Sequence, residues 1–78
     1  MSSGWKKENN TLTKEFNFGN FLEAINFVNK IAKLAETIDH HPDILIHSYR
    51  KVKITLTTHS EGKITEKDYK LAEQINNL

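Results

Sequence analysis

The spacing of apolar residues between positions 20 and 40 constrains the fold of this chain more than any other feature of its sequence. These residues recur every three or four positions, which is the period of a helix with one buried face. They are Phe21, Ala24, Ile25, Val28, Ile31, Ala32, Ala35 and Ile38. Asn20 is a suitable N-cap with Glu23 three residues later, and Pro42 prevents the helix from continuing. The pattern therefore predicts a long amphipathic helix that ends near His40.

Strand patterns lie on both sides of this helix. The four predicted strands span residues 5–8, 11–16, 44–48 and 51–59. Asn9 and Asn10 separate the first two, and both tolerate the left-handed backbone of a two-residue hairpin. Near the end, Thr65 can cap a second helix with one apolar stripe. The predicted order is ββαββα, an α+β fold with helices packed on one face of a four-stranded antiparallel sheet.

A chain of 78 residues without cysteine has few means of stabilising its thin core. A chain of this length buries only about 60–65% of the surface that its unfolded form exposes. Neither a disulfide nor a Cys-based zinc site can form. Association of subunits is the remaining means, so we expect a homodimer or homotetramer of a single domain that spans residues 1–78.

Charge and hydropathy narrow the classes of partner. Eleven Lys and Arg residues against ten Asp and Glu residues give a formal net charge of +1. Nucleic-acid binding requires a concentrated positive field, so no direct nucleic-acid partner is predicted. No apolar run is long enough to span a membrane or resembles a signal sequence, so we expect no membrane partner and a cytoplasmic location.

Three of the four histidines lie at the predicted ends of elements. His40 and His41 follow the long helix, and His59 ends the last predicted strand. Glu36 precedes His40 by four residues, which puts the two on one helical face, within reach of a hydrogen bond that would orient the ring and stabilise its cation. Such a pair can move protons near neutral pH. Taken singly, each histidine is better explained by the helix dipole, and Asp68 by the start of the last helix.

The joint spacing of these residues is more specific than any one of them. From residue 36 to residue 68 the set consists of Glu36, His40, His41, Pro42, Tyr49, His59 and Asp68. This set resembles the signature of the pterin-4a-carbinolamine dehydratases. Further similar stretches are Gly4-Trp5, Phe16-Asn17-Phe18, and residues 39–43 and 52–59. One departure is that the aromatic residue often found after His-His-Pro is here Ile44 or Leu45, which weakens the expected stacking on a pterin ring.

The resemblance implies a reaction and a set of residues. Members of this family remove water from a tetrahydropterin with a hydroxyl at C4a, giving the quinonoid dihydropterin, and need neither a metal nor an organic cofactor. The reaction needs an acid for the departing hydroxyl and a base for the proton of the ring nitrogen, tasks that suit histidines. By resemblance, the catalytic residues are His40, His41 and His59. The residues expected to bind or support the pterin are Glu36, Asp39, Thr57, Thr58, Ser60 and Asp68. The implied functional partner is an aromatic amino acid hydroxylase, which makes this substrate.

Two alternatives stay open at this stage. Three histidines could form a zinc site, but His40 and His41 are adjacent and no established ligand spacing is present. Animal members of the family also serve as dimerisation cofactors of a homeodomain transcription factor. A non-catalytic dimerisation or transcriptional cofactor module, docking through the exposed face of the long helix, is therefore the second alternative.

Overall fold

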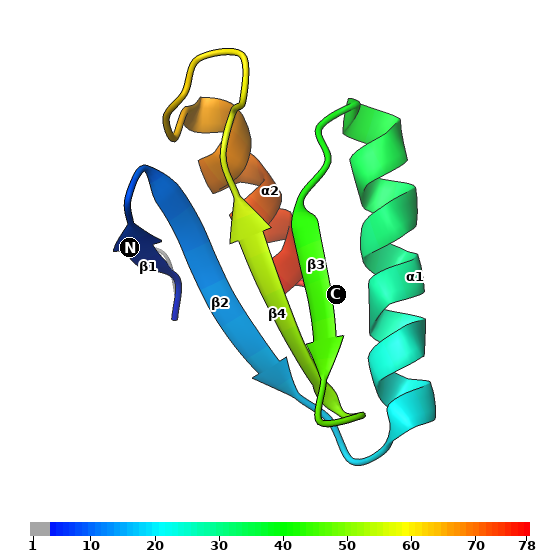
Figure 1. Ribbon diagram of the computed structural model, residues 1–78. Coiled ribbons are helices and arrows are strands. Elements are labelled where there is room, and N and C mark those ends of the chain that lie inside the picture. The colour runs from blue at the N-terminus through cyan, green and yellow to red at the C-terminus, as the bar shows by residue number, and fades with distance from the viewer. Residues whose placement is uncertain (1–3) are drawn as a thin grey trace.

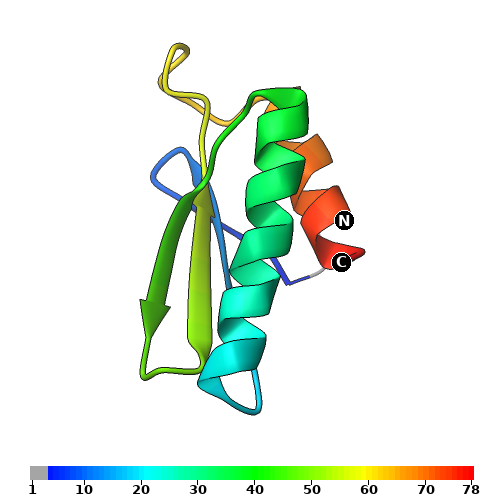
Figure 2. The ribbon, with the colours of Figure 1, turned by 90° about the vertical axis from the view of Figure 1, so that its right-hand side faces the viewer.

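The computed structural model describes residues 4–78, and these form helices and strands in the predicted order. In chain order the elements are β1 (Lys6–Glu8), β2 (Thr11–Asn17), α1 (Phe21–Ile38), β3 (Asp43–His47), β4 (Lys51–Leu56) and α2 (Glu66–Asn76). The strands form an antiparallel sheet with the order β1-β2-β4-β3 (Figure 1). Both helices lie on one face of this sheet (Figure 2). The predicted α+β fold is confirmed.

Helix α1 begins as predicted and ends close to the predicted position. The Asn20 side chain accepts a hydrogen bond from the Glu23 backbone N–H at 2.8 Å, so Asn20 is the N-cap. The helix ends at Ile38, because Asp39 adopts a left-handed conformation with φ of 53°. The next residue, His40, donates its backbone N–H to the Ala35 carbonyl oxygen at 3.1 Å, the bond of a Schellman cap. The helix therefore ends two residues before His40, close to the predicted position.

Left-handed residues also form the two hairpin turns. Asn9 and Asn10, which connect β1 to β2, have φ values of 46° and 65°, as the sequence predicted. Between β3 and β4, Ser48 and Tyr49 have φ values of 49° and 51°. These short turns set the register of each hairpin.

Strand β4 is central in the sheet and supplies much of its apolar face. Val52, Ile54 and Leu56 alternate with outward-facing residues and are fully buried beneath the helices. The predicted strand extended to residue 59, but β4 ends at Leu56 because the chain then turns back on itself. Thr58 pairs with Lys63 across this turn in an isolated bridge.

The helices complete the core with two kinds of side chain. Helix α2 buries Leu71, Ala72 and Ile75, which are three members of its predicted stripe. Helix α1 contributes the Phe27 ring, which packs against Phe16 and Phe18 at centroid distances of 4.7 Å and 4.9 Å. Each fully buried aliphatic side chain contributes about 1.5–3 kcal/mol to folding. The core therefore depends on the docking of both helices onto the sheet.

The opposite face of the sheet is largely polar. Glu15 of β2 and Lys53 of β4 face outward there, and His47 of β3 places its Nε2 2.5 Å from Glu15 Oε2. Neither helix in residues 4–78 has the length and apolarity needed to cross a membrane.

Candidate active site

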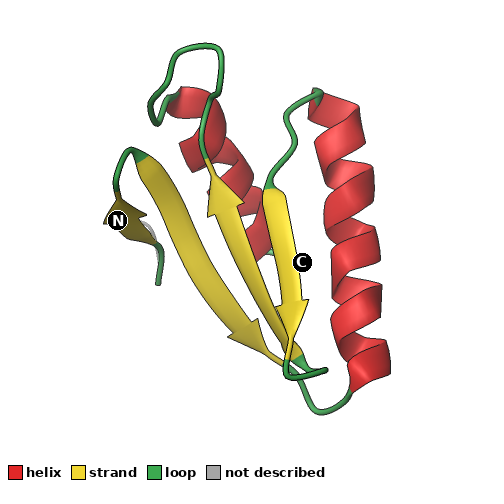
Figure 3. Ribbon diagram, viewed as in Figure 1, coloured by secondary structure: helices red, strands yellow, loops and turns green. Residues whose placement is uncertain are grey.

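Two loops meet at one end of the sheet. The first connects α1 to β3, and the second connects β4 to α2; both lie at the same end of the molecule (Figure 3). The strand register explains this, because Asp43 at the start of β3 pairs with Thr55 near the end of β4. Residues just before Asp43 and just after Thr55 must therefore be neighbours. His40 and His41 belong to the first loop and His59 to the second.

A buried carboxylate holds the His40 ring. His40 Nε2 lies 2.6 Å from Oδ1 of Asp68, which is in the first turn of α2. The Asp68 side chain is 0% exposed and that of His40 is 13% exposed. Oδ2 of Asp68 accepts hydrogen bonds from Thr58 Oγ1 at 2.8 Å and from the Thr65 backbone N–H at 2.9 Å. Both oxygens of this buried carboxylate thus have hydrogen-bond partners, which offsets the cost of removing its charge from water.

Glu36 pairs with His41, and the sequence-based pairing of Glu36 with His40 was wrong. Glu36 Oε2 lies 2.5 Å from His41 Nε2. This second pair is open to solvent, with 53% of the His41 side chain and 76% of the Glu36 side chain exposed. The four-residue spacing would favour His40 only if α1 continued through it. Because Asp39 is left-handed, the chain reverses, and His41 comes to lie beside Glu36.

His59 lies in the exposed turn that follows β4. Its carbonyl oxygen accepts the Gly62 backbone N–H at 3.2 Å, whereas its ring has no hydrogen-bond partner within residues 4–78. The neighbouring Thr57 directs its hydroxyl at the Asn10 carbonyl oxygen, 3.0 Å away. Ser60 is exposed in the same turn, as Asp39 is on the opposite loop. The ring of His59 is therefore accessible to a ligand without the loss of an internal contact.

A hollow of about 340 Å³ adjoins the Asp68 network. It is lined by Thr58, Ser60, Glu61, Thr65, Glu66 and Lys67. Two of these, Thr58 and Ser60, are predicted substrate-binding residues. Residues with hydroxyl and charged groups thus line this hollow, next to the buried Asp68 carboxylate.

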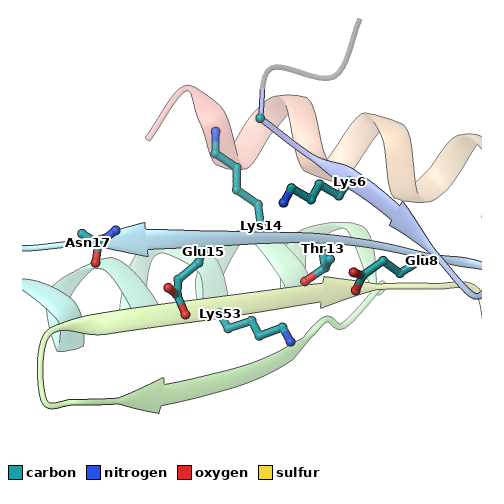
Figure 4. Close-up of a pocket in the computed structure, with 8 residues that line it drawn as sticks. Lys6, Glu8, Thr13, Lys14, Glu15, Asn17 and Lys53 are labelled. Carbon is teal, nitrogen blue, oxygen red and sulfur yellow. The ribbon is translucent and has the colours of Figure 1, made fainter.

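A larger hollow of about 570 Å³ lies at the β1–β2 end of the sheet (Figure 4). Its lining residues are Gly4, Lys6, Glu8, Thr13, Lys14, Glu15, Asn17 and Lys53. Figure 4 shows Lys14 pointing toward α2 and Glu15 pointing to the other face of β2. Like the smaller hollow, it has no histidine in its lining, and it shares no lining residue with the Asp68 network.

The two loops that carry His40, His41 and His59 provide groups that can transfer protons. His40 and His41 each have Nε2 against a carboxylate oxygen, which leaves Nδ1 of each ring available to another group. Imidazoles oriented in this way can act as general acids and bases. Within the described chain, no group of three or more His, Cys, Asp or Glu side chains is arranged to hold a metal ion.

Comparison with known proteins identifies the family of this chain. The family described as pterin 4 alpha carbinolamine dehydratase matches the chain over residues 1–78. The chain belongs to this family.

Relatives within the pterin carbinolamine dehydratase family come from archaea and bacteria. A Sulfolobus acidocaldarius protein, named provisionally as a pterin-4-alpha-carbinolamine dehydratase, is 51% identical over 96% of this chain and 81% of its own length. A Prochlorococcus marinus protein with the same provisional name is 55% identical over 95% of this chain and 77% of its own. Both matches extend across the two loops that carry the histidines.

Solved structures show the same architecture. A transcriptional coactivator/pterin dehydratase from Brucella melitensis superposes with a TM-score of 0.89 at 39% identity, over 95% of this chain and 80% of its own. A pterin dehydratase-like protein described as a RuBisCO assembly factor of the alpha-carboxysome has a TM-score of 0.75 at 24% identity, over 94% of this chain and 83% of its own. The second likeness shows the fold alone.

Sequence reasoning missed one participant in the histidine network. Thr65 was expected only to cap α2, yet its hydroxyl lies 2.6 Å from that of Thr58, which binds Asp68. The sequence does contain a signal, because Thr65 and Asp68 have the Thr-x-x-acid spacing of a capping box. This signal predicts a helix start, and only the fold shows that the acidic member also contacts His40.

Proposed function

We propose that this protein dehydrates 4a-hydroxytetrahydropterin to quinonoid dihydropterin, as a step in the recycling of a tetrahydrobiopterin-type cofactor. The observation that carries the proposal is the buried His40–Asp68 pair, located where the two histidine-bearing loops of a pterin carbinolamine dehydratase fold meet. His41 lies on the same connection as His40, and its partner Glu36 lies in the last turn of α1. The site therefore offers more than one oriented imidazole, as a reaction with an acid and a base requires.

The proposed chemistry needs two proton transfers. The bond between C4a and its oxygen breaks, and an acid supplies the proton with which the hydroxyl leaves as water. A base accepts the proton that the ring nitrogen releases, so the reaction consumes no oxidant or reductant. His40, His41 and His59 are the proposed acid and base groups. Asp39, Thr57, Thr58 and Ser60 are proposed to contact the pterin, with Glu36 and Asp68 supporting the rings.

A direct assay tests this function. Purified protein is added to an aromatic amino acid hydroxylase reaction, and the decay of the carbinolamine absorbance is followed. We expect faster decay in proportion to the protein added. A decay rate equal to the uncatalysed rate at all protein concentrations would contradict the proposal.

We also propose that the chain forms a homodimer or homotetramer through β3. Of the two edge strands, β1 reads Lys-Lys-Glu, and such charges oppose pairing with another chain. The other edge strand, β3, exposes 55% of Leu45 at its centre. A two-fold contact would place copies of β3 opposite each other. Leu45→Lys should therefore lower the mass measured by sedimentation, whereas Glu8→Lys on β1 should not; a wild-type monomer stable on dilution would contradict this.

The alternative of a non-catalytic dimerisation or transcriptional cofactor module receives some support from exposed apolar residues. Phe21 and Leu22, in the first turn of α1, are both more than half exposed. The Brucella melitensis structure is itself described as a transcriptional coactivator as well as a pterin dehydratase. If His41→Ala folds normally but no longer accelerates carbinolamine decay, the result supports the enzyme and not the non-catalytic module. Docking through α1 does not use this ring.

A further inference from the structure

A chain of hydroxyl groups leads from the start of α2 to the His40 carboxylate. Thr65, the N-cap of α2, places its Oγ1 2.6 Å from Oγ1 of Thr58. Thr58 Oγ1 in turn donates to Asp68 Oδ2 at 2.8 Å. Thr58 is 5% exposed and Asp68 is 0% exposed. The bond between Thr58 and Asp68 is therefore buried, and the contact between Thr65 and Thr58 is partly buried.

The direction of each hydrogen bond in this chain follows from the number of protons. A threonine hydroxyl has a single proton to donate. The Thr58 proton is directed at Asp68, so Thr58 can only accept in its contact with Thr65. The Thr65 hydroxyl must therefore be the donor. All donors in the chain point toward Asp68.

The two oxygens of Asp68 are consequently used for different purposes. Oδ2 accepts from Thr58 Oγ1 and from the Thr65 backbone N–H. Oδ1 faces His40 Nε2 at 2.6 Å. With Oδ2 occupied by two donors, the orientation of the carboxylate is fixed, and the hydrogen in the contact with His40 belongs on Nε2.

We propose that Thr65 is a positioning residue for His40. Through Thr58 and Asp68, its hydroxyl holds the neutral His40 ring as the tautomer with hydrogen on Nε2. Nδ1 then has the free electron pair that accepts a proton, or it carries the proton when the ring is cationic. The role of Thr65 in catalysis rests on the proposed dehydratase function. Its effect on the His40 tautomer does not depend on that function.

A purely structural role would have different consequences. An N-cap residue stabilises its helix whether or not it contacts a catalytic group. Asn20 provides a matched case, because its side chain caps α1 through a 2.8 Å bond and has no contact with Asp68. Loss of either cap should destabilise the protein, but only loss of the Thr65 hydroxyl should change the His40 ring.

The experiment compares Thr65→Val, Thr65→Ser and Asn20→Ala with the wild type. Valine has nearly the shape of threonine and keeps the backbone N–H that donates to Asp68, while a methyl group replaces the hydroxyl and its contacts with Thr58 and the Asp68 backbone N–H. The tautomer ratio of the neutral His40 ring is measured from its ¹⁵N chemical shifts, and kcat and KM from carbinolamine decay. We expect Thr65→Val to raise the share of the Nδ1–H tautomer and to lower kcat about 2- to 12-fold, the value of one net hydrogen bond, with KM unchanged. Thr65→Ser should restore both quantities.

Asn20→Ala should lower the melting temperature and leave the tautomer ratio and kcat as in the wild type. The positioning role is overturned if Thr65→Val keeps the wild-type ratio, or if Asn20→Ala alters the ratio to the same extent. Failure of the proposed function is a separate result: wild-type protein would then be inactive, while the ¹⁵N shifts would still report whether Thr65 positions the ring.

Discussion

Two adjacent histidines in this chain have opposite surroundings. The His40 ring contacts a carboxylate that is completely buried, whereas the His41 ring contacts one that is mostly exposed. The distances are nearly equal, at 2.6 Å and 2.5 Å. Two pairs of the same chemical type therefore differ in burial and not in contact distance. The comparison separates what a histidine–carboxylate contact contributes from what its burial contributes.

Burial should make the first pair a fixed part of the fold and leave the second adjustable. Removing one partner of a buried ion pair leaves an uncompensated polar group, whereas exposed pairs contribute about 0–1 kcal/mol and are screened by salt. His41 and Glu36 can thus rearrange around a ligand at little cost. The pair formed by His40 and Asp68 cannot do so without disturbing the start of α2.

The largest effect should come from removing the exposed rings. His41→Ala and His59→Ala should each lower the dehydration rate about 10²- to 10⁴-fold, because they remove groups proposed to transfer protons. Little stability should be lost, since both side chains are exposed. Carbinolamine decay and thermal melting measure the two quantities. Near-normal rates in both variants would exclude these rings as acid and base.

Asp68→Asn should have the next largest effect, and here stability and activity should fall together. The amide nitrogen cannot accept from Thr58, Thr65 or His40, so at least one buried donor loses its partner. The free energy of unfolding should fall by about 1–3 kcal/mol. Denaturant titration gives this value. A loss no larger than that of Glu36→Gln would show that burial does not distinguish the two pairs.

Glu36→Gln should be milder in both respects. The amide oxygen can still accept a hydrogen bond from His41 but cannot stabilise its cation. We expect less than about 1 kcal/mol of lost stability, as for other exposed pairs. The rate should fall less than in His41→Ala, measured in the same carbinolamine assay. An equal loss in the two variants would make the carboxylate as necessary as the ring.

The smallest effect should come from a third pair that has the same chemistry but lies elsewhere. His47 and Glu15 are 2.5 Å apart on the polar face of the sheet, away from the two loops. His47→Ala should therefore leave the dehydration rate within a small factor of the wild-type rate. A large loss of rate in this variant would mean that the site extends to the other face of the sheet.

Local patterns predicted the elements of the fold well. The Asn20 cap, the left-handed Asn9 and Asn10, and the alternation in β4 depend on neighbouring residues, and each is present in the structure. The end of α1 was less predictable, because Asp39 occupies a position where glycine is the usual signal. Because α1 ends at Ile38, His40 is outside the helix, and its four-residue spacing from Glu36 does not bring the two side chains together.

The pairing of His40 with Asp68 was beyond the reach of local patterns. These residues are 28 positions apart, and their contact depends on the register of β3 with β4 and on the docking of α2. The resemblance to a family did place both residues in one site. It did not indicate which carboxylate contacts which ring, because this depends on the direction that the backbone takes at Asp39, after α1.

The left-handed Asp39 has a consequence for how this chain tolerates changes in length. Residues 39–42 connect α1, which carries the Glu36 carboxylate, to β3. The pairing of β3 with β4 fixes the position of the other end of this loop. A one-residue insertion or deletion there would turn both imidazoles away from their carboxylates, even with every side chain retained. The hairpin at Asn9 and Asn10 is also made of left-handed residues, but it joins strands that hold neither of the two histidine–carboxylate pairs of the candidate site. Lengthening that hairpin should be tolerated. Among related sequences, insertions should therefore be more frequent at the Asn9–Asn10 turn than within residues 39–42.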